Sequence, residues 1–265
     1  MICNALGALE YFSAANIPVP HGFTTRLGGV SRGSFASMNI GTHRGDSREN
    51  VLKNYEILGS AIGFDVKNCV LTRQTHTDII RCVTARDAGA GLFAPEFDPC
   101  DGLVTNTPGL ALVVFAADCT PVLLSDPVTG AVGAVHAGWK GTAQDIVGKA
   151  VEVMVSHFGA DPKNIRAAIG PNIGQCCFQT DGDVPQALEA AYGPAVQEHI
   201  KTIGEKYYVN LKAVNAMALL RRGVTDIEIS AECTRCRPDR YWSARVHRDD
   251  RGSQGAIIVC KEAGK

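Results

Sequence analysis

A carboxylate, a thiol and an imidazole that lie close together in the sequence are the first candidates for chemistry in this chain. Asp118 and Cys119 follow one apolar run, and His136 ends another, with a turn between the two. A second imidazole, His76, follows a strand-like run upstream. Two imidazoles and a thiolate suit Zn²⁺, and three protein ligands leave a fourth position for water or substrate. We therefore predict a metal or nucleophile centre at His76, Cys119 and His136.

The same residues permit other interpretations. Cys119 could be a nucleophile with His136 as its base, as in cysteine hydrolases. A thiol that ligates a metal is not free to attack a carbonyl carbon, so these two interpretations exclude each other in any one state. The remaining alternatives are a non-catalytic metal site, or a buried free cysteine beside two hydrogen-bonded histidines. The residue pattern leaves all of these open.

Asp118 has two interpretations of its own. In an extended segment its side chain points to the face opposite that of Cys119, where it would hold the loop. If the strand bends at this point, the carboxylate becomes a candidate general base. The sequence favours neither role.

Four further side chains are candidates for binding phosphate or substrate. Segment 136–141 joins a predicted strand to a helix, and its glycines allow a ligand to approach the backbone closely. Lys140 adds a mobile positive charge to this segment. Arg26 and Asn39 are candidates to meet an anion or a sugar, with a solvated loop as the alternative, and Gln74 completes the set.

Composition and charge exclude two classes of partner. The 265-residue chain has a formal net charge of −1 and no polybasic stretch, which argues against binding to nucleic acid or to an anionic membrane. The longest apolar run, residues 110–117, is far too short to span a bilayer. Since no signal peptide is visible at the N-terminus, we expect a cytoplasmic protein.

Ten cysteines could form a disulfide framework, but their placement argues otherwise. Cys69, Cys82 and Cys260 lie inside apolar, strand-like runs, where free cysteine behaves as a small hydrophobic residue. Reduced thiols are therefore the better interpretation.

Cys233 and Cys236 form a lone CxxC motif. A zinc knuckle would need a second such pair, and the adjacent Cys176 and Cys177 lack that spacing. We assign the motif a structural role.

The elements around these residues predict the fold class. Apolar residues at helical spacing predict a helix over 51–62. Asp46, with Glu49 three positions later, resembles a capping box at its start. Another helix is expected over 146–158. Strand-like runs separated by hairpin turns alternate with these helices. The pattern favours an α+β sandwich, as a single domain over residues 1–265, rather than a regular βαβ winding.

Five motifs occur in order along the chain: Gln74-Thr75-His76, Asp101-Gly102-Leu103-Val104-Thr105, Ala117-Asp118-Cys119-Thr120-Pro121-Val122, His136-Ala137-Gly138-Trp139-Lys140-Gly141 and Ala168-Ile169-Gly170-Pro171-Asn172-Ile173-Gly174. With them, the chain resembles the bacterial family labelled laccase domain or multicopper polyphenol oxidase, also called the YfiH family. The resemblance extends from His21 to the Cys236 region. Lys140 departs from the family, in which arginine is frequent at this position.

The resemblance implies a four-layer α/β/β/α sandwich with mixed sheets, and Zn²⁺ held by His76, Cys119 and His136. It also implies phosphorolysis of adenosine, inosine, guanosine and methylthioadenosine, and deamination of adenosine. In these reactions Asp118 is the first candidate for proton transfer, and Lys140 or Arg26 for orienting phosphate. Relatives also suggest a Cys-His hydrolase, for example an amidase in cell-wall precursor editing.

The oxidase label can be tested on composition. A multicopper oxidase ligates four coppers, mostly through imidazole, whereas this chain has seven histidines and no His-x-His pair. A laccase-type cluster cannot be built from them. Cu²⁺ as a substitute at the three-ligand site stays open, because it outcompetes Zn²⁺ for many nitrogen and sulfur donors. A copper-dependent polyphenol oxidase is the least favoured function.

Overall fold

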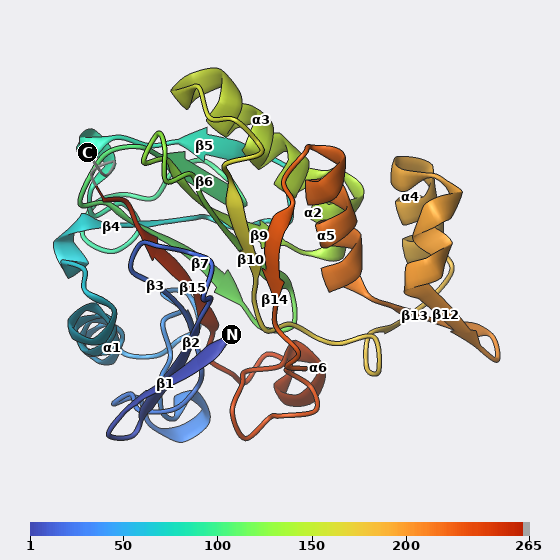
Figure 1. The fold of residues 1–265 in the computed structure, drawn as a ribbon. Coiled ribbons are helices and arrows are strands. Elements are labelled where there is room, and N and C mark those ends of the chain that lie inside the picture. Colours follow the sequence, from blue (N-terminus) through green and yellow to red (C-terminus); the bar gives the residue numbers. More distant parts are fainter. Residues whose placement is uncertain (262–265) are drawn as a thin grey trace.

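Two six-stranded sheets lie face to face at the centre of the molecule (Figure 1). The computed structural model describes residues 1–261. In spatial order, the first sheet contains β1 (Ile2–Leu6), β2 (Leu9–Ser13), β3 (His21–Thr24), β15 (Gln254–Val259), β7 (Ala111–Ala116) and β4 (Cys69–Leu71). The second contains β14 (Asp226–Ile229), β10 (Arg166–Ile169), β8 (Thr120–Ser125), β9 (Val132–Ala137), β6 (Gly102–Thr105) and β5 (Ile80–Cys82). A small third sheet contains β11 (Gln179–Thr180), β13 (Lys206–Val209) and β12 (Ile200–Ile203).

Helices cover the outer faces of both large sheets (Figure 1). The α-helices are α1 (Arg48–Ile62), α2 (Trp139–Ala143), α3 (Ile146–Phe158), α4 (Asp183–Tyr192), α5 (Leu211–Arg221) and α6 (Ala244–His247). The short 3₁₀ helices are η1 (Gly33–Phe35), η2 (Val66–Asn68), η3 (Ala85–Asp87) and η4 (Pro194–His199). Within the described residues, no helix combines the length and the apolar character that a membrane crossing requires.

Successive residues of a strand point to opposite faces of its sheet. Each central strand therefore contributes side chains to two different hydrophobic cores. In β8, Val122 and Leu124 belong to the core beneath α3, whereas Leu123 lies between the sheets. In β7, Val113 belongs to the core beneath α1, whereas Leu112 faces the second sheet. Both large sheets contain parallel and antiparallel pairs. The predicted α+β class, a four-layer α/β/β/α sandwich with mixed sheets, is confirmed.

The helix predicted over 51–62 is α1, but its predicted cap is wrong. The N-cap is Ser47, whose side-chain oxygen accepts a hydrogen bond from the backbone N–H of Asn50. The carboxylate of Asp46 accepts hydrogen bonds from the side chains of Ser31 and Asn39 in the preceding loops, and also from the N–H of Ser47 and the side chain of Asn50. Glu49 lies in the first turn, where its charge complements the helix dipole.

Two connections carry the chain from the first sheet to the second, and they determine where the candidate ligands lie. The β4–β5 connection contains His76, and the β7–β8 connection contains Cys119. His136 lies in β9, directly opposite Pro121 of β8. Because β8 and β9 are neighbours, all three candidate ligands arrive at one end of the sandwich.

Candidate metal centre

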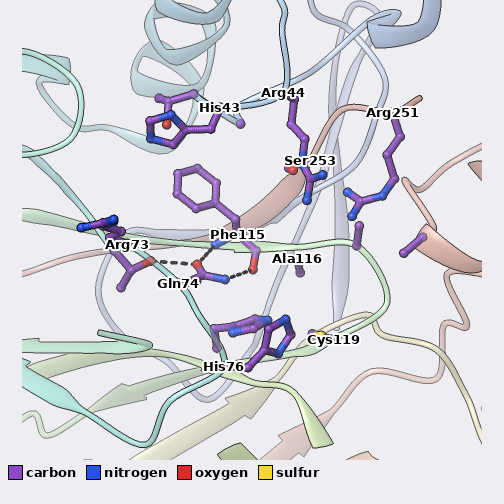
Figure 2. Close-up of a pocket in the computed structure, with 16 residues that line it drawn as sticks. His43, Arg44, Arg73, Gln74, His76, Phe115, Ala116, Cys119, Arg251 and Ser253 are labelled. Carbon is purple, nitrogen blue, oxygen red and sulfur yellow. Dashed lines mark hydrogen bonds between the residues drawn. The ribbon is translucent and has the colours of Figure 1, made fainter. Parts of the chain in front are cut away.

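The three predicted ligands converge on one point. A donor atom from each of His76, Cys119 and His136 lies within 4.8 Å of the other two. The side chains of His76 and Cys119 lie close together at the base of a cavity (Figure 2), and His136 lines the same cavity. His136 is buried, Cys119 is half-buried and His76 is exposed. The centre is therefore open on one side, as a site that admits a substrate must be.

Asp101 shapes the loop that presents His76. Its carboxylate accepts hydrogen bonds from three consecutive backbone N–H groups, those of Thr75 at 3.2 Å, His76 at 3.1 Å and Thr77 at 2.7 Å. The three N–H groups can converge because His76 has a left-handed backbone, with φ of 62°. The side chain of Asp101 is completely buried, so these bonds are shielded from water.

The same carboxylate orients the second imidazole. Nδ1 of His136 lies 2.7 Å from Oδ1 of Asp101. A carboxylate in this position accepts a hydrogen bond from Nδ1–H and leaves Nε2 free to ligate a metal. Burial raises the pKa of Asp101, but its hydrogen bonds to His136 and Thr77 outweigh this effect and lower the pKa to about 2. Asp101 was assigned no role from the sequence, although it lies in one of the family motifs.

The electrostatics of the two imidazoles differ. Burial lowers the pKa of His136, but the charge on Cys119 and the Asp101 carboxylate outweigh burial and raise the pKa to about 9. Burial and the nearby charge of His136 lower the pKa of His76. Without metal, these shifts favour the charged form of His136 and the neutral form of His76.

Gly138 allows the ligands to approach one another. A Cβ atom at this position would lie 2.7 Å from Nδ1 of His76 and 3.3 Å from the sulfur of Cys119. The glycine-rich segment 136–141 thus makes room for the centre. Together with the soft thiolate and the two imidazoles, this space fits Zn²⁺, or Cu²⁺ as a substitute.

A cavity of about 340 Å³ opens above the three ligands. Besides the three ligands, four cationic or ionisable side chains line it, and the sequence patterns singled out none of them as a ligand-binding residue: His43, Arg44, Arg73 and Arg251. Figure 2 shows Arg44 and Arg251 across the cavity from His76 and Cys119. His43 and Arg44 are neighbours in one loop, Arg73 directly precedes the Gln74-Thr75-His76 motif, and Arg251 precedes β15. No single motif therefore contains all four residues.

Arg251 is an unusual arginine because it is buried and incompletely paired. The residue is 8% exposed, and its Nε has no hydrogen-bond partner among the described residues. One terminal nitrogen donates to the carbonyl of Gly252 at 3.1 Å. Burial and the nearby charge of Arg44 lower its pKa to about 10. A buried guanidinium with a free donor, beside a second cation, can bind an anion.

Asp118 lies outside the residues that line the cavity. Its backbone is left-handed, with φ of 88°, so the chain bends here. One carboxylate oxygen accepts from the hydroxyl of Thr234 at 2.6 Å, and the other accepts from the hydroxyl of Ser243 at 2.9 Å and the N–H of Arg245 at 2.8 Å. This geometry favours the loop-holding interpretation over that of a general base.

Arg26 and Lys140, the two cations singled out from the sequence, do not line the cavity. The guanidinium of Arg26 lies 3.9 Å from the ring centroid of Trp242 and donates to the carbonyls of Pro238 and Ala36. Lys140 is exposed, with its ammonium 5.7 Å from the Trp139 ring centroid. Arg26 therefore ties loops together, and the cations of the cavity are other residues.

Asn39 and Gln74 hold backbone segments of the cavity wall in place. The buried side chain of Asn39 accepts hydrogen bonds from the N–H groups of Gly41 at 2.9 Å and Ser253 at 2.8 Å, both of which line the cavity. Gln74 lines the cavity itself and pairs with both backbone groups of Phe115 (Figure 2). Both amides position loops, and their own hydrogen-bonding groups are largely satisfied.

The chain is similar in sequence to a described protein family and to several named proteins. Residues 20–261 match the sequence model of a family described as multi-copper polyphenol oxidoreductase laccase. The purine nucleoside phosphorylase YlmD of Geobacillus stearothermophilus is 37% identical over 243 residues, covering 90% of this chain and 88% of that protein. A purine nucleoside phosphorylase of Deinococcus radiodurans is 38% identical over 250 residues, covering 94% of this chain and 92% of its own length.

Solved structures show the same fold. The crystal structure of the hypothetical protein YfiH from Bacillus licheniformis superposes with a TM-score of 0.91 and 35% identity, covering 97% of both chains. The structure of YlmD from Geobacillus stearothermophilus superposes with a TM-score of 0.91 and 34% identity, covering 98% of both chains.

Proposed function

Because this chain belongs to the multi-copper polyphenol oxidoreductase laccase family, and its relatives include proteins named purine nucleoside phosphorylase, we propose that it cleaves purine nucleosides with phosphate. The family membership confirms the resemblance inferred from the motifs. The observation that carries the proposal is one cavity with two different walls. His76, Cys119 and His136 form one wall, and Arg44 and Arg251 form the other.

Phosphate binds to the arginine wall in this proposal. Guanidinium groups match phosphate with paired, charge-assisted hydrogen bonds. Arg251 is held in place by burial and retains an unpaired Nε donor. Arg44 and Arg73 add positive charge from neighbouring loops of the same cavity. These three arginines replace Lys140 and Arg26 as the candidates for orienting phosphate.

The nucleoside binds between the arginines and the three-ligand wall. The ring of Phe115 lines the cavity and offers an apolar face to a purine. In phosphorolysis a phosphate oxygen attacks C1′ of the ribose while the bond to the purine nitrogen breaks, and the base leaves with the bonding electrons. Zn²⁺ at His76, Cys119 and His136 would supply a Lewis acid at this wall. Asp101 keeps His136 oriented, and Gln74 keeps Phe115 in place.

The proposal extends to the substrates implied by the family resemblance: adenosine, inosine, guanosine and methylthioadenosine, with deamination of adenosine as a second reaction. In this scheme Asp118 does not transfer a proton to substrate. Its carboxylate is occupied by Thr234, Ser243 and Arg245, and it positions the adjacent Cys119. Multicopper oxidase chemistry is not proposed, because the centre contains two imidazoles and one thiol.

The deciding experiment incubates Zn²⁺-loaded protein with each nucleoside, with and without phosphate, and separates the products by chromatography. We expect free purine and ribose 1-phosphate only when phosphate is present. Adenosine should also yield inosine without phosphate. Cys119→Ala, which removes one ligand, should abolish both reactions. Turnover of none of the four nucleosides by metal-loaded protein would contradict the proposal.

A cysteine hydrolase is the second candidate, because Cys119, His136 and Asp101 form a nucleophile–base–carboxylate series. His136 is hydrogen-bonded to Asp101 through Nδ1, and one of its ring nitrogens lies within 4.8 Å of the sulfur of Cys119. Amide cleavage of a cell-wall precursor is the reaction this arrangement would support. Full activity on an amide after removal of metal, with loss of activity on alkylation of Cys119, would favour it over the phosphorylase.

A further inference from the structure

Four cysteines outside the cavity come together at a second point. The sulfur atoms of Cys176, Cys177, Cys233 and Cys236 all lie within 4.8 Å of one another. The first two follow β10, and the other two follow β14, the strand paired with β10. The expectation that the CxxC motif has no second pair is therefore wrong. The adjacent cysteines supply that pair through the fold rather than through matched spacing.

The separations of the sulfur atoms match a tetrahedral metal site. The sulfur of Cys236 lies 3.7 Å from that of Cys176 and 3.4 Å from that of Cys177. In a tetrahedral site with Zn–S bonds of about 2.3 Å, neighbouring sulfurs lie about 3.8 Å apart. All four cysteines are free thiols in the structure. The cluster has the dimensions of four ligands around one ion.

Donors and cations surround the sulfur atoms. The N–H of Gly174 donates to the sulfur of Cys233 at 3.1 Å, and the guanidinium of Arg235 donates to that of Cys177 at 3.4 Å. Arg245 lines the same hollow. The ammonium of Lys212, buried nearby, donates to the carbonyls of Ser230 at 2.8 Å and Glu232 at 2.5 Å. Four thiolates around a divalent cation carry a net charge of −2, and these groups offset it.

We propose that Cys176, Cys177, Cys233 and Cys236 bind one Zn²⁺ in an all-thiolate site, separate from the centre at the base of the cavity. Thiolate is the ligand that Zn²⁺ takes in closed structural sites, which have four protein ligands and no open position. Binding releases the thiol protons to solvent, so the affinity rises with pH.

The site joins the two segments that position Asp118. The segment of Cys233 pairs with that of Asn172 through an isolated bridge, in which the N–H of Thr234 donates to the carbonyl of Asn172 at 3.0 Å. The hydroxyl of Thr234 donates to Asp118 from one segment, and the N–H of Ile173 donates to its carbonyl from the other at 3.0 Å. A metal here would stabilise the position of the residue next to Cys119.

The first test is the Zn²⁺ content of dialysed, reduced protein. Wild type should bind about one Zn²⁺ per chain more than Cys236→Ser, and also about one more than Cys119→Ala. The two losses should add in the double variant. Cys3→Ser, at an exposed cysteine outside both clusters, should bind as much as wild type. Cys176→Ser provides a second variant at an exposed position, and circular dichroism verifies folding.

The second test uses Co²⁺ and a thiol reagent. Four thiolates should give Co²⁺-loaded protein a strong sulfur-to-metal absorption, most of which Cys236→Ser removes and Cys119→Ala leaves in place. The cluster thiols of Zn²⁺-loaded protein should react with the thiol reagent only after a chelator is added. The proposal is overturned if folded Cys236→Ser and Cys176→Ser bind as much Zn²⁺ as wild type, or if the four thiols react equally fast with and without Zn²⁺.

Discussion

The carboxylate of Asp101 lies 2.7 Å from Nδ1 of His136, and both side chains are buried. The same carboxylate accepts the backbone N–H of His76 at 3.1 Å. One acidic side chain therefore orients one candidate ligand directly and fixes the loop of another. This relationship makes Asp101 the positioning residue on which the geometry of the centre depends most.

Asp101→Asn should weaken the metal centre while retaining its shape. The amide has nearly the same size as the carboxylate. It lacks the negative charge that orients His136, and it is a poorer acceptor of hydrogen bonds from the three backbone N–H groups. Loss of such a partner lowers metal affinity about 10- to 100-fold, and we expect an additional loss of about 1–3 kcal/mol in unfolding free energy. Chelator competition and urea unfolding measure the two effects. Asp98→Asn, at an exposed position, is the matched control, and equal Zn²⁺ affinity in both variants would refute the assignment.

Gly138→Ala tests the space between the ligands. A methyl group there would lie 2.7 Å from Nδ1 of His76 and 3.3 Å from the sulfur of Cys119, so the imidazole must move away from the metal. We expect nucleoside turnover and Zn²⁺ content at this centre to fall together, by about 10-fold or more. Gly182→Ala, where a Cβ meets its nearest atom at 3.6 Å, should leave both unchanged. Normal Zn²⁺ content in Gly138→Ala would show that the centre tolerates the methyl group.

Arg251→Ala tests the phosphate wall. Charge-assisted hydrogen bonds contribute about 1.5–3 kcal/mol, so the KM for phosphate should rise about 10- to 100-fold. The KM for nucleoside should change much less. Arg44→Ala, on the surface of the same wall, should shift the same constant in the same direction without the risk of unfolding. Arg86→Ala, exposed and away from the cavity, is the control. A change confined to the nucleoside KM would place phosphate elsewhere.

Asp46 makes the loops beside the cavity sensitive to acid. Burial raises the pKa of its carboxyl, but hydrogen bonds from Ser31, Asn39 and Asn50 outweigh this and lower the pKa below its ordinary value. A carboxyl with a depressed folded-state pKa contributes stability above its unfolded value, about 3.9, and loses it as the pH falls through the folded-state pKa.

Asp46→Asn should therefore destabilise the protein at pH 7 and differ less from wild type at pH 3. Urea midpoints at the two pH values measure this difference. Asp98→Asn should match wild type at both. A deficit in Asp46→Asn that is the same at pH 3 and pH 7 would show that shape, and not charge, accounts for the loss.

The sequence alone determined the local elements and the ligand types. Helical spacing located α1, because a helix buries one face, and continuous apolar runs located the central strands, because each of these strands buries both faces. His76, Cys119 and His136 could be chosen because thiol and imidazole side chains at the ends of buried runs are unusual. The hairpin of β12 and β13 was not predicted from the sequence.

Only the tertiary structure decided which distant residues meet. Asp101 reaches His76 because β5 pairs with β6, and Cys176 reaches Cys236 because β10 pairs with β14. Arg251 lines the same cavity as the candidate metal centre because β15 lies beside β7 in the first sheet. Sequence spacing carries no information about such pairings, which follow from how two twisted sheets bury a common core. The chemistry of the ligands was therefore readable residue by residue, whereas the second thiol cluster and the arginine wall were products of the fold.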